Sequence, residues 1–300
     1  MDTFREEHQE SLTATCRLLG RSRQVYYRRI RSHREYRQKA TAVVAMVNTV
    51  RMEQPRIGTR KLYHLLKEDL KRINVGRDRL FAILRANHML VRPKRSYHIT
   101  TDSHHRFRKH GNTVKGLSIH RPEQVWVSDI TYVGNRKNPM YLALVTDAYS
   151  KKIVGYDLSD SLSLPGSYRA LKMASNGRTT EHPLIHHSDR GLQYCSDGYQ
   201  ALLAKNKIKS SMTEAYDPYE NAVAERVNGI LKQEFLLSSD NLDLKTMKRL
   251  VSNSVRIYNN KRPHYSCHYL TPQQMHGQQE ITMRTYKSQK LNGTMAVELN

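Results

Sequence analysis

The stretch Val125-Trp-Val-Ser-Asp-Ile-Thr-Tyr-Val133 predicts a β-strand, because it is rich in β-branched and aromatic residues. Asp129 stands in the middle of this run, and Trp126, Val127 and Ile130 beside it suit burial. A carboxylate in such surroundings is costly unless a cationic partner balances its charge. We therefore expect a positively charged ligand or side chain beside Asp129.

The sequence on both sides of this strand predicts an α/β sheet. Three strands follow one another closely, as in a meander, and helices and strands then alternate. The predicted strands cover 125–133, 141–147, 152–158, 183–187 and 208–212, and the predicted helices follow Pro165 and cover 198–206 and 219–237. This order is typical of a sheet with helices packed on its faces.

The front of the chain predicts a basic all-α region. Residues 1–120 hold 27 basic and 10 acidic side chains, whereas residues 121–300 hold 23 and 17. The predicted helices form a helix-turn-helix pattern over 12–31, broken at Gly20 with Ser22 as a cap, a helix over 36–53 that Pro55 ends, and a second helix-turn-helix pattern over 58–91. We expect this region to bind nucleic acid phosphates; an ordinary helical bundle with a basic, soluble surface is the alternative.

Composition excludes several classes of protein. The chain has 300 residues and a formal net charge of +23, and no uncharged apolar run is long enough to span a membrane. Its first ten residues are polar and acidic, unlike a signal or transit peptide. Three widely spaced cysteines favour neither a disulfide framework nor a zinc site, and they fit a reducing cytoplasm. The charge points to a polyanionic partner.

Two further carboxylates stand where sites are commonly built. Asp189 comes just after the fourth predicted strand, and strand ends carry the sites of open α/β sheets. Glu225 lies early in the long helix, at the edge of its apolar stripe and beside small residues. Magnesium prefers oxygen ligands, and converging carboxylates could hold two ions that activate an attacking oxygen and stabilise a leaving one.

Several motifs, in order, resemble the integrase core of bacterial insertion-sequence transposases, the DDE class of the retroviral-integrase superfamily. They are Trp126-Val-Ser-Asp-Ile-Thr-Tyr132, His187-Ser-Asp-Arg-Gly-Leu-Gln-Tyr194, Asn221-Ala-Val-Ala-Glu225, Leu231-Lys-Gln-Glu-Phe235, Tyr258-Asn-Asn-Lys-Arg-Pro-His264 and Leu270-Thr-Pro272. The interval of 35 residues between Asp189 and Glu225 is also that family's. Upstream, the stretch from Pro55 to Arg92 resembles the family's helix-turn-helix region. The likeness is to the second-reading-frame product of IS-three-type elements.

The resemblance implies an RNase H-like integrase core and a DNA transposase. It implies that Asp129, Asp189 and Glu225 are the catalytic residues and the ligands of two Mg²⁺ ions, with Mn²⁺ as a substitute. Such an enzyme binds the terminal inverted repeats of its element, cleaves the DNA strand and transfers it. Two alternatives stay open from the residues alone: a catalytically silent DNA-binding regulator, and a plain metal-dependent nuclease of the same fold.

Other residues are expected to contact DNA or to support the fold. Lys232 follows Glu225 by seven residues and so returns to nearly the same helix face, about 20° away. We expect Lys232, Arg226, Arg60 and Lys61 to contact DNA. Asp147 is expected to be structural, His186 and His187 to be packed or hydrogen-bonded, and the Arg262–His264 segment to dock the final helix.

The expected organisation has five segments. They are an N-terminal helical DNA-binding segment at 1–54, a helix-turn-helix-like domain at 55–95, a linker at 96–120, the RNase H-like catalytic core at 121–280 and a tail at 281–300. The expected partners are double-stranded DNA (element ends and target), further copies of the chain in a multimer on DNA, and a protein from an upstream reading frame, separate or fused. We expect the chain in the bacterial cytoplasm, associated with the nucleoid, and not in a membrane.

Overall fold

The computed structural model describes residues 5, 7–92, 110–134, 139–214, 221–237, 242–278 and 281–283. The chain divides into two compact units. The first, here the helical unit, comprises residues 1–52 and 58–91; the second, the sheet unit, comprises residues 53–57 and 92–300. A domain boundary was predicted between residues 54 and 55, but the helices on either side of it lie in the same unit. The five-segment organisation as a whole stays a prediction.

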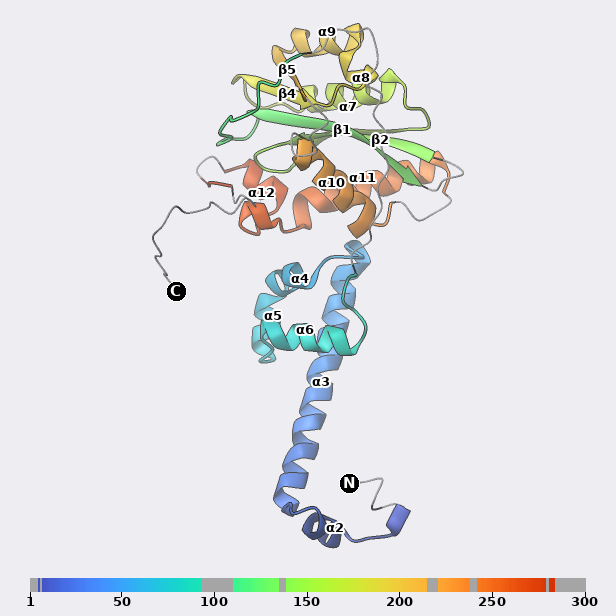
Figure 1. Ribbon diagram of the computed structural model, residues 1–300, viewed down its shortest axis with the longest axis vertical. Helices are drawn as coiled ribbons and strands as arrows, with labels where there is room; N and C mark the ends of the chain where they lie inside the picture. Colours follow the sequence, from blue (N-terminus) through green and yellow to red (C-terminus); the bar gives the residue numbers. More distant parts are fainter. Residues whose placement is uncertain are drawn as a thin grey trace. The chain divides into compact units, whose positions relative to one another are not determined.

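The helical unit is all-α (Figure 1). Its helices are α2 (Leu12–Leu18), α3 (Arg23–Glu53), α4 (Thr59–Leu65), α5 (Lys67–Arg72) and α6 (Arg77–Ala86). Fully buried aliphatic side chains hold it together, among them Val43, Val47, Leu62, Leu70, Leu80, Ile83 and Leu84. These residues recur at helical spacing, and burying each one adds about 1.5–3 kcal/mol of hydrophobic stabilisation.

One prediction for this unit is wrong in detail. The two helices expected within residues 22–53 are one continuous helix of 31 residues, α3. No glycine or proline occurs between Arg23 and Glu53, so nothing in the backbone ends the helix. Its start is as expected, because the Val25 amide donates to Ser22 Oγ at 3.3 Å.

The sheet unit is built on a five-stranded sheet in the order β3-β2-β1-β4-β5. The strands are β1 (Val125–Gly134), β2 (Pro139–Asp147), β3 (Ile153–Ser159), β4 (Leu184–Ser188) and β5 (Ile208–Met212). The first three form an antiparallel meander, in which Asp129 is opposite Leu144. The last two run parallel to β1 and are reached by helical crossovers. The predicted α/β sheet is therefore confirmed.

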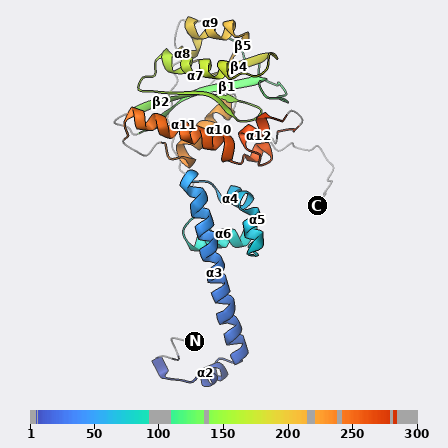
Figure 2. The ribbon, with the colours of Figure 1, turned by 180° about the vertical axis from the view of Figure 1, so that it is seen from behind.

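Helices cover both faces of this sheet (Figures 1 and 2). They are α7 (Leu164–Asn176), α8 (Leu192–Cys195) and α9 (Asp197–Lys205) on one face, and α10 (Ala222–Glu234) and α11 (Leu244–Lys261) on the other, followed by a 3-10 turn (Tyr265–Cys267) and α12 (Pro272–His276). A hydrophobic core lies on each face of the sheet, and alternate residues of β2 point into one core or the other. Leu142 and Leu144 pack with α10 and α11, whereas Ala143 and Val145 pack with α7, α8 and α9.

One glycine sets the distance between α7 and the sheet. A Cβ atom on Gly155 of β3 would lie 2.1 Å from the carbonyl oxygen of Ala170 and 2.9 Å from the Cβ of Ala174. Only glycine permits this approach. Among the described helices of both units, none is long and apolar enough to cross a membrane.

Candidate functional site

Asp129 lies midway along β1, at the centre of the sheet, and is partly buried. Its Oδ2 atom accepts a hydrogen bond of 2.6 Å from the side-chain amide of Asn228, which is itself 4% exposed. Asp129 lies in a strand because the residues around it favour β-structure. Asn228 on α10 fixes the orientation of its carboxylate.

Asp189 lies directly after β4, the strand parallel to β1 and next to it. Its Oδ1 atom accepts from the Gly191 amide at 3.0 Å and so shapes the turn into α8. A Cβ atom on Gly191 would lie 3.0 Å from the same oxygen, so a larger residue at this position would crowd the Asp189 carboxylate. The structure thus places Asp189 at the strand end, as predicted.

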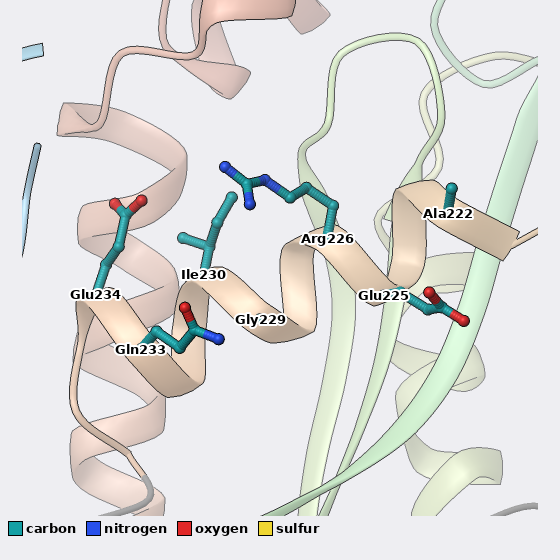
Figure 3. A pocket seen from close by; sticks show the side chains of 7 residues that line it. All are labelled: Ala222, Glu225, Arg226, Gly229, Ile230, Gln233 and Glu234. Carbon is teal, nitrogen blue, oxygen red and sulfur yellow. The ribbon is translucent and has the colours of Figure 1, made fainter. Parts of the chain in front are cut away.

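Glu225 lies in the first turn of α10 and is exposed. It lines an open cavity of ≈ 330 Å³ along this helix, together with Ala222, Arg226, Gly229, Ile230, Gln233 and Glu234. Figure 3 shows Glu225 and Arg226 pointing away from each other. The small side chains at positions 222 and 229 leave the helix surface beside Glu225 open.

Three hydrogen bonds hold α10 against β1. The Asn221 side-chain amide donates to the Ser128 carbonyl at 3.1 Å, Asn228 donates to Asp129, and Lys232 Nζ donates to Thr131 Oγ1 at 3.1 Å. These donors face the strand from the cap of the helix and from two later positions along it. The carboxylate of Asp129 is therefore held within the contact between strand and helix.

The other two carboxylates act electrostatically on Asp129. Burial first, then the charge of Asp189 and to a smaller extent that of Glu225, raise the pKa of Asp129 to about 7, against the hydrogen bond from Asn228. Partial desolvation also raises the pKa of Glu225, although its side chain is largely exposed. Among the described residues, no three acidic, histidine or cysteine side chains are close enough to form a complete metal site. The cluster is one of crowded negative charge that a cation would relieve.

Lys232 supplies a positive charge to this cluster. Burial lowers the pKa of its ammonium group, and the charge of Asp129 opposes that shift. Its contact with Thr131 places the ammonium on the strand that carries Asp129. Lys232 therefore belongs to the site by its position, whereas Arg226 lies on the exposed surface of α10.

Arg60 and Lys61, the other two predicted DNA-binding residues, lie in the first turn of α4 in the helical unit. Arg60 is exposed and lines a separate cavity there, whereas Lys61 is partly buried.

Two buried polar groups near the site are structural. The Nε2 atom of His186 lies 2.7 Å from Ser128 Oγ and 2.9 Å from the Tyr199 hydroxyl, and burial lowers the pKa of the ring to about 3. Asp147 accepts from the Glu123 amide and from the amide and hydroxyl of Ser150, each at 2.7 Å. The expectations for both residues are confirmed.

Arg262 ties the end of α11 to α10, which differs from the expectation that its segment docks the final helix. It is 1% exposed, and it makes a two-pronged ion pair with Glu234, with both N–O distances 2.8 Å. The pair joins the C-terminal ends of α10 and α11. It thereby fixes the far end of the helix that carries Glu225.

Sequence reasoning missed Asn221, Asn228 and Thr131. A signal for Asn228 was present, because it falls between Glu225 and Lys232 on nearly the same helix face. No comparable pattern marks Thr131, whose role depends on which helix crosses β1.

Comparisons with known proteins agree with this architecture. Two models of the integrase core domain match the chain, one over residues 119–218 and the other over residues 206–272. Together they cover the sheet from before β1 to the start of α12.

Curated relatives cover more of the chain. The transposase InsF for insertion sequence IS3A of Escherichia coli K12 is 30% identical over 286 residues, which cover 90% of this chain and 96% of the relative. An uncharacterized 31 kDa protein of insertion element IS600 from Shigella sonnei is 34% identical over 228 residues, 74% of this chain and 82% of the relative.

Solved structures resemble the chain more distantly. The catalytic core domain of HTLV-2 integrase, in complex with magnesium, has 22% identity and a TM-score of 0.42, covering 52% of this chain and 97% of that one. A chain of a simian T-cell lymphotropic virus intasome has 17% identity and a TM-score of 0.47, covering 79% of this chain and 81% of that one.

The sheet order and the integrase core models define the class of protein, a polynucleotidyl transferase with an RNase H-like core. Within that class, the chain belongs to the IS3 type of DDE transposases, because the IS3A transposase InsF matches 90% of its length at 30% identity.

Proposed function

We propose that this transposase cleaves DNA at the terminal inverted repeats of an insertion sequence and joins the freed ends to target DNA, with Asp129, Asp189 and Glu225 as its catalytic residues. The observation that carries the proposal is the charge cluster at Asp129. Its raised pKa reflects burial first and then the charges of two neighbouring carboxylates. Carboxylates with pKa values perturbed in this way cluster at functional sites.

The three side chains fit a pair of Mg²⁺ ions, or Mn²⁺ in their place. Their donor atoms are carboxylate oxygens, and Mg²⁺ commonly uses one or two carboxylates together with water and substrate phosphates. A complete protein cage is therefore not required before DNA arrives. When bound, such ions supply Lewis acidity to the attacking and leaving oxygens at phosphorus.

The chain's own residues would orient this chemistry. Asn228 holds the Asp129 carboxylate in one orientation, and Asp189 is fixed by the turn at Gly191. In the first step, water attacks the phosphorus at the element end, and the bond to the 3′ oxygen breaks. In the second, the freed 3′ hydroxyl attacks a target phosphodiester and displaces its 3′ oxygen. Lys232, at Thr131, would offset negative charge on the phosphate.

Both units would contact double-stranded DNA. Lys232 and Arg226 would contact it from α10, and Arg60 and Lys61 from α4. Two element ends must meet in one reaction, so we expect a homo-multimer assembled on DNA. A protein from an upstream reading frame, separate or fused, would complete the active form. The reaction would take place at the nucleoid in the bacterial cytoplasm.

A strand-transfer assay tests the proposal. The full chain is incubated with a labelled duplex that carries the terminus of its own element, a target plasmid, and Mg²⁺, Mn²⁺ or EDTA. Joined products should require metal and should vanish in Glu225→Gln, but persist in Glu181→Gln, which changes an exposed acid after α7. Cleavage without joining would indicate a nuclease. Binding alone, repeated with the fused upstream frame, would indicate a silent regulator.

A further inference from the structure

A second cavity, of ≈ 430 Å³, lies in the helical unit, far in sequence from the carboxylates. It is lined by Arg60 of α4 and by four residues of α6, namely Arg77, Asp78, Phe81 and Arg85. Three arginines and one aromatic residue thus line the same cavity. The cleavage and joining steps use none of these residues, although Arg60 is already among those proposed to contact DNA.

The cavity carries a net positive charge. Its one carboxylate, Asp78, accepts from Arg77 Nε at 3.0 Å, and both side chains are largely exposed. The side chains of Arg60 and Arg85 are exposed, and neither makes a hydrogen bond or ion pair with the described part of the chain. This arrangement suits an anionic ligand that approaches from solvent.

Two other arginines of the helical unit contact side chains of the protein. Arg79 lies over the Tyr36 ring of α3, 5.2 Å from its centroid. Arg72 pairs with Asp69, 3.2 Å away and one turn along α5. Arg60 and Arg85 therefore differ from Arg72 and Arg79 of the same unit, and Arg72 gives a matched control.

Helix geometry suggests the ligand. Arg77, Phe81 and Arg85 follow one another at steps of four residues and so form one stripe along α6. At 1.5 Å per residue the stripe is about 12 Å long, close to the width of the major groove of B-DNA. Arginine is suited to the phosphates at both sides of a groove, and an aromatic ring between them to base edges, including the thymine methyl group.

The side of α6 adjoining this stripe is held by packing. Leu80, Ile83 and Leu84 are fully buried in the core of the helical unit. The stripe is therefore presented by a helix whose orientation within its unit is fixed by packing. A rigid element of this kind loses little conformational entropy when it binds.

We propose that α6 is the helix that enters the major groove of double-stranded DNA. Arg77 and Arg85 contact phosphates on either side, Phe81 faces the base edges, and Arg60 contacts an adjoining phosphate. This inference rests on the proposed function, since it names the part of the helical unit that holds the DNA substrate.

The first test is the salt dependence of binding. The full chain is titrated against a fluorescent 30-base-pair alternating AT duplex at several salt concentrations. Each lost phosphate contact should lower the slope of log affinity against log salt by about 0.9. Arg85→Gln and Arg60→Gln should each show this loss, and Arg72→Gln should not. Equal slopes for Arg85→Gln and Arg72→Gln would overturn the proposal.

The second test concerns Phe81. The wild-type chain should bind the AT duplex about fourfold more tightly than the same duplex with uracil for thymine, which lacks one methyl group. Phe81→Leu, which retains an apolar side chain, should reduce this preference. Tighter binding of the single strand than of the duplex would refute insertion into a groove. Unchanged circular dichroism and melting of each variant show that the helices persist.

The two proposals fail in different ways. If the chain joins DNA ends but Arg85→Gln binds the duplex with an unchanged salt slope, this inference is wrong and the transposase reaction stands. If the slopes change as expected but the wild type joins no ends even with the fused upstream frame, the binding helix stands and the proposed reaction is wrong.

Discussion

Asn228 Nδ2 donates to Asp129 Oδ2 at 2.6 Å, across 99 residues of chain. This bond connects the central strand of the sheet to the helix that carries Glu225. Asn228 is 4% exposed, so the contact is made away from solvent. It is the most direct means by which the fold sets the orientation of a proposed metal ligand.

Replacing Asn228 should impair strand transfer more than it impairs folding. Asn228→Ala removes the donor and leaves a partly buried carboxylate oxygen without its partner, a loss of about 1–3 kcal/mol, or about 5- to 150-fold in rate. Asn228→Asp should be worse, because it places another negative charge beside Asp129. The rate of joining, measured against Mg²⁺ concentration, should show a higher metal requirement for both variants.

A control for that experiment is Asn260→Ala, since Asn260 bonds to the Arg256 carbonyl on the exposed side of α11. Unfolding can be followed through Trp126, the single tryptophan of the chain, which is fully buried in β1. If Asn228→Ala joined ends at the wild-type rate and metal requirement, the positioning role would be wrong.

His186 should make the sheet unit less stable in acid. Burial lowers the pKa of the folded ring to about 3, whereas an unfolded histidine titrates near ~6.5. Below pH ~6.5 the unfolded chain therefore takes up a proton that the folded chain excludes. Stability is complete above that pH and is lost as the pH falls toward the folded pKa, by about 1.4 kcal/mol per pH unit.

Urea unfolding between pH 7.5 and pH 5, followed by Trp126 fluorescence, measures this effect. Trp126 is paired with His186 in the β1–β4 register, so the probe reports on the right part of the molecule. His186→Gln should show a shallower pH dependence than the wild type, whereas His182→Gln, at an exposed histidine, should not. Equal pH slopes for His186→Gln and wild type would refute the argument.

The fold of the sheet unit could be predicted because its signals are local. Alternating and β-branched residues predicted the strands, and Asp189 at a strand end could be assigned from the strand alone. The Asn228–Asp129 contact could not be predicted, because it depends on where α10 crosses the sheet. The continuity of α3 was underestimated, since its polar, basic first half lacks the apolar stripe that usually marks a helix.

Breaking the buried ion pair between Arg262 and Glu234 should destabilise the sheet unit. Arg262→Met removes the cation and leaves Glu234, which is 17% exposed, without its charge partner, at a cost of about 3–5 kcal/mol. The double variant Arg262→Met/Glu234→Gln should recover much of this loss. A double-mutant cycle from urea unfolding would contradict the prediction if the two single losses simply added.

Two glycine substitutions should have opposite effects. Gly155→Ala forces a Cβ atom to 2.1 Å from a backbone oxygen of α7 and should destabilise the sheet unit by about 2–3 kcal/mol or more. Gly229→Ala meets no atom within 4 Å and should stabilise α10 by up to about 1 kcal/mol. Thermal unfolding of both variants measures the contrast, and similar melting temperatures would contradict it.

Lys232 should act through its charge as well as its contact with Thr131. Its partly buried ammonium lies where Asp129 favours the charged form, although burial lowers its pKa. Lys232→Gln removes that charge and should lower the rate of joining by about tenfold, the value of one charge-assisted hydrogen bond. Lys232→Arg should retain more of the rate. Lys248→Gln, at an exposed position of α11, is the matched control. If Lys232→Arg lost as much rate as Lys232→Gln, the shape of the lysine side chain would matter and its charge would not. The two variants therefore separate electrostatic stabilisation of the phosphate from packing.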